Sequence, residues 1–242
     1  MLLHGMMSLS GTWWRIGPEL AARGWDVWAL DLLAHGSSPP YERPLSIEAL
    51  VARTVREAPD RVDLLVGHSL GAVTAAAALA RHRHLAGAVV LEDPPGGPGV
   101  DARELADGVE RDARDVRRDR GRLLRRSAEE HPGWAPEDVE HDVRGIEEAQ
   151  AGSIAGGLRD QLRTWDLPAL VTAVRVPVLV LAGAPERGGV LTEPARSEVA
   201  ALLPVGRFIE LPGGHCLHRD LPDAWLASVT AFADEVLPAR AR

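Results

Sequence analysis

Ser69 stands in a pattern that is typical of a catalytic nucleophile. The pentapeptide Gly67-His68-Ser69-Leu70-Gly71 follows the apolar run Leu64-Leu65-Val66 and leads into an alanine-rich stretch. A serine between a strand and a helix stands on a sharp turn, whose strained backbone excludes side chains two residues before and two residues after it. Glycine at both of these positions therefore favours a nucleophilic hydroxyl at the end of a strand.

A free serine hydroxyl is inert, so this interpretation needs a histidine base, an acid that orients the histidine and backbone donors for an oxyanion. His215 follows two glycines in a loop directly after the last apolar strand, and it follows Ser69 in the sequence. We expect His215 to be the base. His218 is expected to be exposed and not a metal ligand.

The elements that must position these residues alternate along the chain. Apolar strands separated by helices indicate an α/β fold, with a mostly parallel central sheet and helices on both faces. The expected strands are residues 2–3, 27–30, 62–66, 88–91, 176–181 and 207–211, and the expected helices are residues 11–23, 46–58, 70–83, 194–203 and 223–237.

The composition changes between the fourth and fifth expected strands. Half of the residues between 101 and 150 are charged, and apolar residues such as Val109, Ala113 and Val116 recur at helical spacing. We expect a core formed by residues 1–93 and 171–242, and a helical cap, or lid, formed by residues 94–170 above the strand ends, where α/β proteins bind ligands.

Five motifs together give the chain a family resemblance. The chain resembles the α/β-hydrolase fold superfamily, in particular its capped serine esterase and lactonase-like branch. The motifs are Leu2-Leu3-His4-Gly5, the segment 31–38, the pentapeptide around Ser69, the segment 176–183 and Gly213-Gly214-His215.

The resemblance implies the remaining site residues. The oxyanion donors would be the amides of Met6 and Leu70, and His35 would stabilise a loop. The acid would be Glu186, three residues past Gly183.

Two acids at the end of the strand after Ser69 stay open as alternatives for the orienting acid, Glu92 first and then Asp93. Trp134 and Trp165 are candidates to bind an apolar part of the substrate. The resemblance implies no metal and no organic cofactor.

Charge and composition exclude several partners. The chain of 242 residues has a formal net charge of −8 with acidic and basic residues interleaved, which does not favour binding to nucleic acid or to an anionic membrane. A single cysteine, Cys216, leaves no internal disulfide. The sequence opens on no charged leader, and no run of about 18 apolar residues occurs in it, so we expect a cytoplasmic protein.

The first expected strand begins at Leu2. The resemblance implies one or two further strands before it, so the sheet is expected to have an uncovered edge. A homodimer, a truncated chain or a misassigned start would each account for that edge.

Taken together, the sequence predicts a serine hydrolase that cleaves a small apolar carboxylic ester or lactone through an acyl-enzyme. Two alternatives stay open. One is a non-catalytic protein that binds a small molecule on a hydrolase scaffold. The other is a cofactor-free perhydrolase or hydroxynitrile lyase that uses the same residues.

Overall fold

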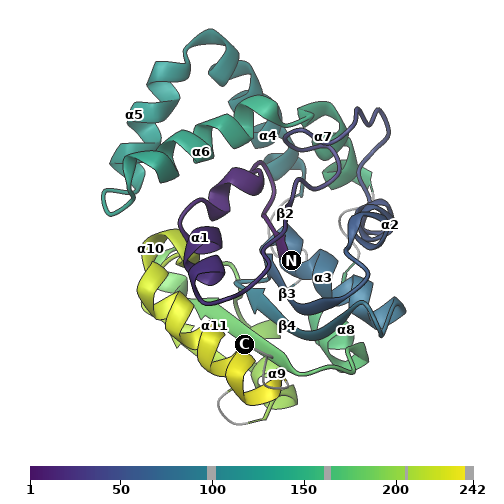
Figure 1. Cartoon of the computed structure of the whole chain (residues 1–242). Coiled ribbons are helices and arrows are strands. Elements are labelled where there is room, and N and C mark those ends of the chain that lie inside the picture. Colours follow the sequence, from purple (N-terminus) through teal and green to yellow (C-terminus); the bar gives the residue numbers. More distant parts are fainter. Residues whose placement is uncertain (97–101, 161–164, 205–206, 238–242) are drawn as a thin grey trace.

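A single six-stranded sheet organises the molecule (Figure 1). The computed structural model describes residues 1–96, 102–160, 165–204 and 207–237. The strand order is β2-β1-β3-β4-β5-β6, and every neighbouring pair is parallel. The strands are β1 (Leu2–Leu3), β2 (Ala29–Leu30), β3 (Val62–His68), β4 (Ala86–Glu92), β5 (Val178–Gly183) and β6 (Phe208–Leu211). The predicted α/β fold class is confirmed.

Helices cover both faces of the sheet. On one face pack α2 (Ile47–Glu57), α3 (Leu70–Arg81), α8 (Leu167–Ala173) and α9 (Ala195–Leu202), and on the other pack α1 (Ile16–Ala22) and α11 (Pro222–Val236) (Figure 1). Successive residues of a strand point to opposite faces, so Leu65 joins the α2–α3 side while Leu64 and Val66 join the α11 side. Burial on both sides explains why the central strands are continuously apolar.

The first expected helix is divided in two. Residues 11–23 form a short 3₁₀ helix, η1 (Ser10–Trp13), and then α1. Pro18 has no amide hydrogen and is tolerated only in the first turn of a helix, so the regular helix begins just before it. Gly24, which follows α1, has a positive φ of 84° that glycine adopts without strain.

Between β4 and β5 the chain runs through α4 (Ala102–Arg118), α5 (Arg120–Glu130), α6 (Pro136–Glu148), α7 (Ala151–Asp160) and α8. We call α4 to α7 the helical insertion. Val116, Leu123 and Val143 form a small core of its own. A Cβ atom on Gly145 of α6 would lie 2.6 Å from the carbonyl oxygen of Met7, so α6 lies against the loop that follows β1.

Helix α8 falls across the expected boundary at residue 170. Leu167 at its start is fully buried in the core on the α3 side of the sheet. The division of the chain into a core and a cap stays a prediction. Within the described residues, no helix is both long enough and apolar enough to cross a bilayer.

Candidate active site

Ser69 lies on the sharp turn between β3 and α3. Its backbone has φ 53° and ψ −117°, a conformation that residues with side chains adopt only under strain. The Ser69 N–H donates to the Glu92 carbonyl at 2.9 Å, which ties the turn to the end of β4. A Cβ on Gly67 would lie 2.3 Å from the Gly71 carbonyl oxygen, and one on Gly71 would lie 2.5 Å from the carbonyl oxygens of β1 and of His4. Both glycines are therefore required for this close approach of backbone to backbone.

His215 lies in the loop after β6 and contacts a carboxylate at the end of β4. Its Nδ1 is 2.7 Å from Asp93 Oδ2, and 29% of the His215 side chain is exposed while none of the Asp93 side chain is. Because the carboxylate accepts a hydrogen bond from Nδ1–H, the Nε2 atom of the neutral imidazole keeps a free lone pair. This is the arrangement that a general base requires.

Asp93 is itself held by backbone donors from the end of β5 and from the loop after it. The amides of Gly183, Val190 and Leu191 donate to its carboxylate at 3.1, 2.8 and 3.4 Å. Burying a carboxylate is costly unless hydrogen bonds replace its hydration, and these donors replace it. Asp93 has a positive φ of 38°, so the chain turns sharply as it leaves β4.

The structure does not bring Glu186, the first candidate for the acid, to His215. Glu186 lies on the short helix η2 (Pro185–Arg187) and is exposed, while the Nδ1 of His215 is bonded to Asp93. The loop after β5 contributes to the site through amides that hold Asp93, and not through a carboxylate of its own. Glu92, the second candidate, points away from His215 toward α11, where the Trp225 Nε1–H donates to it at 2.9 Å.

His68, between the nucleophile turn and the histidine loop, brings Ser69 and His215 to the same end of the sheet. Its Nε2–H donates to the His215 carbonyl at 3.0 Å, and the two imidazole rings are 4.6 Å apart between centroids. Burial lowers the pKa of His68 well below its ordinary value, so the ring is neutral. His68 thus packs beside the turn.

Two buried histidines shape the loop after β1, which carries the expected oxyanion donor Met6. His4 Nδ1–H donates to the Gly5 carbonyl at 2.7 Å, and the Met7 amide donates to His35 Nε2 at 3.1 Å. Burial lowers the pKa of His4 to about 4 and that of His35 to about 3, so both rings are neutral and can accept. The amide of Met6 thus lies between two anchored residues, and His35 stabilises the loop as predicted.

The second expected donor, Leu70, is the first residue of α3. The first amides of a helix have no carbonyl partner within the helix, and they carry the positive end of its dipole. The amide of Leu70 is therefore suited to bind a developing negative charge.

A second acid–histidine pair lies beneath the first. His218 is 3% exposed, which contradicts the expectation that it lies at the surface. Its Nδ1–H donates to Glu92 Oε1 at 2.7 Å, and its Nε2 accepts from the Thr12 hydroxyl at 2.8 Å. Burial lowers the pKa of His218 well below its ordinary value and raises that of Glu92.

This pair belongs to the one group with metal-ligand geometry among the described residues. The potential ligand atoms of His68, Glu92 and His218 lie within 4.8 Å of one another. Both nitrogens of His218 already have hydrogen-bond partners, and the Nε2 of His68 is bonded to the His215 carbonyl. The group is therefore a hydrogen-bonded network that supports the histidine loop.

Neither tryptophan expected at the substrate has a free indole N–H. Trp134, between α5 and α6, donates to Asp220 Oδ1 at 2.6 Å, and Trp165 donates to the Pro95 carbonyl at 2.7 Å. Their role in substrate binding stays a prediction.

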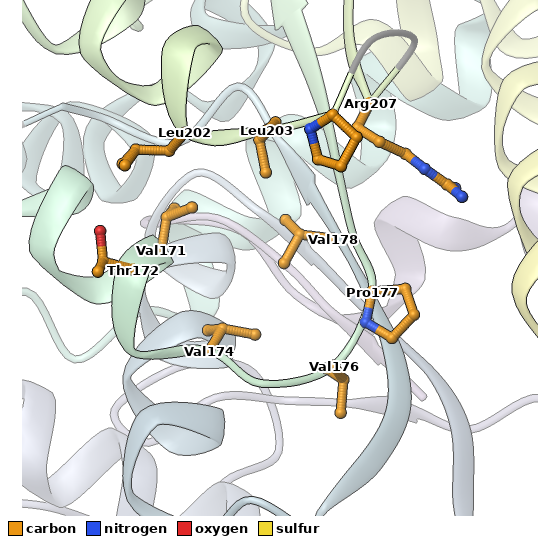
Figure 2. A pocket seen from close by; sticks show the side chains of 10 residues that line it. Val171, Thr172, Val174, Val176, Pro177, Val178, Leu202, Leu203 and Arg207 are labelled. Atoms are coloured by element: carbon orange, nitrogen blue, oxygen red, sulfur yellow. The ribbon is translucent and has the colours of Figure 1, made fainter.

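A cavity of about 460 Å³ lies away from these residues, between α8, α9 and the start of β5 (Figure 2). It is lined mainly by aliphatic side chains, among them Val171, Val174 and Val178. Ser69 and His215 lie beyond the opposite, carboxyl ends of the strands, so this cavity is not part of the site.

Comparison with known proteins identifies the fold group. The model of a family described as the alpha/beta hydrolase family matches residues 1–229. No curated protein sequence matches the chain. Among solved structures, an N-formylmaleamic acid deformylase from Pseudomonas putida S16 has 19% identity and a TM-score of 0.76, covering 95% of this chain and 90% of its own.

Two esterases are similar to the chain to the same degree. A thermophilic esterase from Thermogutta terrifontis has 21% identity and a TM-score of 0.74, covering 98% of this chain and 89% of its own. An esterase from Exiguobacterium antarcticum has 16% identity and a TM-score of 0.74, covering 96% and 90%. At these identities the likeness is one of fold.

Proposed function

Because the chain belongs to the alpha/beta hydrolase family, we propose that it is a serine hydrolase that cleaves carboxylic esters or lactones through an acyl-enzyme. The contact between His215 Nδ1 and the buried Asp93 carboxylate carries the proposal, since it leaves Nε2 as a base at the end of the sheet where Ser69 stands on its strained turn. Esterases are also among the chains of similar fold.

The proposed reaction has two halves. In the first, the Ser69 Oγ attacks the ester carbonyl while His215 Nε2 takes its proton, and Asp93 stabilises the imidazolium that forms. Collapse of the tetrahedral intermediate expels the alcohol, which receives the proton from His215. In the second half, His215 activates a water that releases the acyl group and restores the serine hydroxyl.

The amides of Met6 and Leu70 would bind the oxyanion of both tetrahedral intermediates. Preorganised donors of this kind lower the barrier by about 3 kcal/mol each. Support comes from the loop of Met6, which His4 and His35 hold on both sides, and from the place of Leu70 at the start of α3.

The variant Ser69→Ala tests the nucleophile. We expect hydrolysis of a short-chain aryl ester to fall by at least ~10³-fold, because the remaining groups only polarise the carbonyl. Thermal unfolding of the same variant checks that the fold is retained. Turnover close to that of the unaltered protein would contradict the proposal.

A serine-reactive fluorophosphonate separates catalysis from mere binding. We expect stoichiometric labelling of the unaltered protein at Ser69 and none of Ser69→Ala, detected by mass spectrometry of the peptide that contains residue 69. A protein that binds a small ester but is not labelled would favour the binding protein on a hydrolase scaffold.

A further inference from the structure

One carboxylate joins the loop of His215 to the helical insertion. Asp220, the last residue of α10 (Leu217–Asp220), accepts from the Gly214 amide through Oδ2 at 2.6 Å. Its other oxygen, Oδ1, accepts from the indole N–H of Trp134 at 2.6 Å. Gly214 immediately precedes His215, and Trp134 lies between α5 and α6.

The backbone that leads into His215 is closely packed around this carboxylate. A Cβ on Gly214 would lie 2.6 Å from the Arg187 carbonyl oxygen and 3.2 Å from Asp220 Oδ2, and one on Gly213 would lie 3.2 Å from the Asp220 Cβ. The Gly213 carbonyl accepts from the Ala184 amide at 2.9 Å. A shift of the Asp220 side chain therefore displaces the peptide that carries His215.

Trp134 is held by His131 of the insertion and by Arg219 of α10. Its ring stacks on His131 with centroids 3.7 Å apart, and the Arg219 guanidinium carbon lies 4.5 Å from the ring centroid. Arg219 also donates to Asp142 on α6 at 3.1 Å. The direction of the indole N–H is thus set by the insertion and by the histidine loop together.

We propose that Asp220 is a positioning residue for His215, and that Trp134 of the helical insertion fixes the orientation of Asp220. The insertion then influences the chemical step through this carboxylate, apart from any effect on substrate entry. The proposal rests on the proposed function, since it assigns His215 the role of base. Displacing a catalytic group by about 1 Å costs up to about 10²-fold in rate, so a modest shift of His215 has a measurable effect.

Asp220→Asn tests the carboxylate. The amide keeps the shape of the side chain but has one acceptor oxygen in place of two, so either Gly214 or Trp134 loses its acceptor. We expect kcat for an aryl ester to fall by about 10- to 100-fold, with KM changed by less than about threefold. An unchanged kcat, or a loss carried by KM alone, would overturn the proposal.

Trp134→Phe tests the insertion side without removing the ring. It deletes the N–H donor and keeps an aromatic surface for His131 and Arg219, so it disturbs the packing less than a substitution that removes the ring. We expect kcat to fall by about 3- to 10-fold, with no further loss when the substitution is added to Asp220→Asn, because the two act through one contact. Fully multiplicative losses would contradict the coupling.

Trp14→Phe is the matched control. The Trp14 indole N–H donates to Asp138 on α6 at 2.8 Å, which is the same kind of bond between the core and the insertion but involves neither Asp220 nor Gly214. We expect its kcat to stay within about twofold of the unaltered protein. Equal losses in Trp14→Phe and Trp134→Phe would show that a general loosening of the insertion is responsible, and would overturn the proposal.

A far-downfield proton resonance is expected from the His215 Nδ1–H, because it is hydrogen-bonded to the Asp93 carboxylate, and it gives a readout that needs no turnover. We expect it to shift or broaden in Asp220→Asn and Trp134→Phe and to stay unchanged in Trp14→Phe. If the unaltered protein neither hydrolyses esters nor reacts with a fluorophosphonate, the proposed function fails, while this resonance still decides the positioning. A resonance that is the same in the unaltered protein and in all three variants would refute the positioning role of Asp220.

Discussion

Glu92 and Asp93 are adjacent in the sequence but belong to different environments. Glu92 is the last residue of β4, and its side chain lies among Trp225 and His218 beneath the site. Asp93 follows the strand on a turn with positive φ and reaches His215. Two acid–histidine pairs therefore lie side by side, and of the two imidazoles it is that of His215 that is accessible from solvent.

Asp93→Asn tests this assignment, with Glu186→Gln as its control. An amide at position 93 no longer stabilises the imidazolium of His215 and favours the wrong tautomer, so kcat is expected to fall by about 10³-fold or more. Glu186 is exposed on η2, and its loss is expected to leave kcat within about twofold. Initial rates with the same aryl ester measure both variants. A large loss in Glu186→Gln alone would restore that residue as the acid.

The element that matters most for the site is the turn from β3 into α3. It is possible only because α3 starts in direct contact with β1. A Cβ on Gly71 would lie 2.5 Å from the carbonyl oxygens of Leu3 and His4, and no flexible side chain is available there to move aside. The same contact brings α3 beside the loop of Met6, so the geometry of the nucleophile and that of the expected oxyanion donors depend on one helix.

Gly71→Ala is therefore expected to lower the free energy of unfolding by about 1–3 kcal/mol, the cost of overpacking, and to reduce activity as well. Gly152→Ala on α7 is the matched control, because nothing lies within 4 Å of its Cβ position. There the gain in helix propensity is expected to stabilise the protein by up to about 1 kcal/mol. Urea unfolding measures both. Equal effects of the two substitutions would indicate that helix propensity, and not the close approach of α3 to β1, determines the change in stability.

At the scale of the whole molecule, several neutral imidazoles are buried around the site. Burial lowers the pKa of His4 from 6.5 to about 4 and that of His35 to about 3, and it lowers the pKa of His68 and of His218 well below the ordinary value. Glu92 has the opposite effect on proton binding, because burial raises its pKa and so favours its protonated form in the folded state. It therefore offsets part of the effect of the histidines on the pH dependence of stability. Protonation of these four histidines is therefore disfavoured in the folded state.

Stability is expected to fall as the pH decreases from about 6.5 toward 4. In this window the unfolded chain protonates at His4 and His35 and the folded chain does not, so each of them lowers the free energy of unfolding by about 1.4 kcal/mol per pH unit. Above pH 6.5 both states are neutral, and this contribution is constant. Urea unfolding at half-unit steps between about pH 7 and 5 measures the slope.

His35→Gln separates this origin from others. A glutamine amide oxygen is able to accept from the Met7 amide as His35 does, but it does not titrate. The slope of the free energy of unfolding against pH is therefore expected to decrease by about 1.4 kcal/mol per pH unit, whatever the change in stability at pH 7. A slope that is flat in the unaltered protein, or equal in His35→Gln, would show that these imidazoles do not govern the acid sensitivity.

The homodimer expected from the sheet edge also stays a prediction. Sedimentation at several protein concentrations tests it.

Local features of the sequence were enough to predict the α/β fold and the placement of Ser69 and His215. The alternation of apolar strands with helices, the helical spacing of apolar residues and the paired glycines around Ser69 are all local properties of the sequence. Each has a direct cause in the geometry of the backbone. The acid could not be identified in the same way. Glu186, Glu92 and Asp93 all lie at or just after the carboxyl ends of parallel strands, so strand ends alone do not distinguish them.

Only the tertiary structure decided which carboxylate meets His215, and that His218 and Arg219 are buried. The reason is that these contacts join residues far apart in the sequence. They depend on side-chain direction and on donors from other segments, such as the amides of Gly183 and Val190 around Asp93. The sequence specifies which chemical groups are present. Their partners are set by how the strands and helices pack.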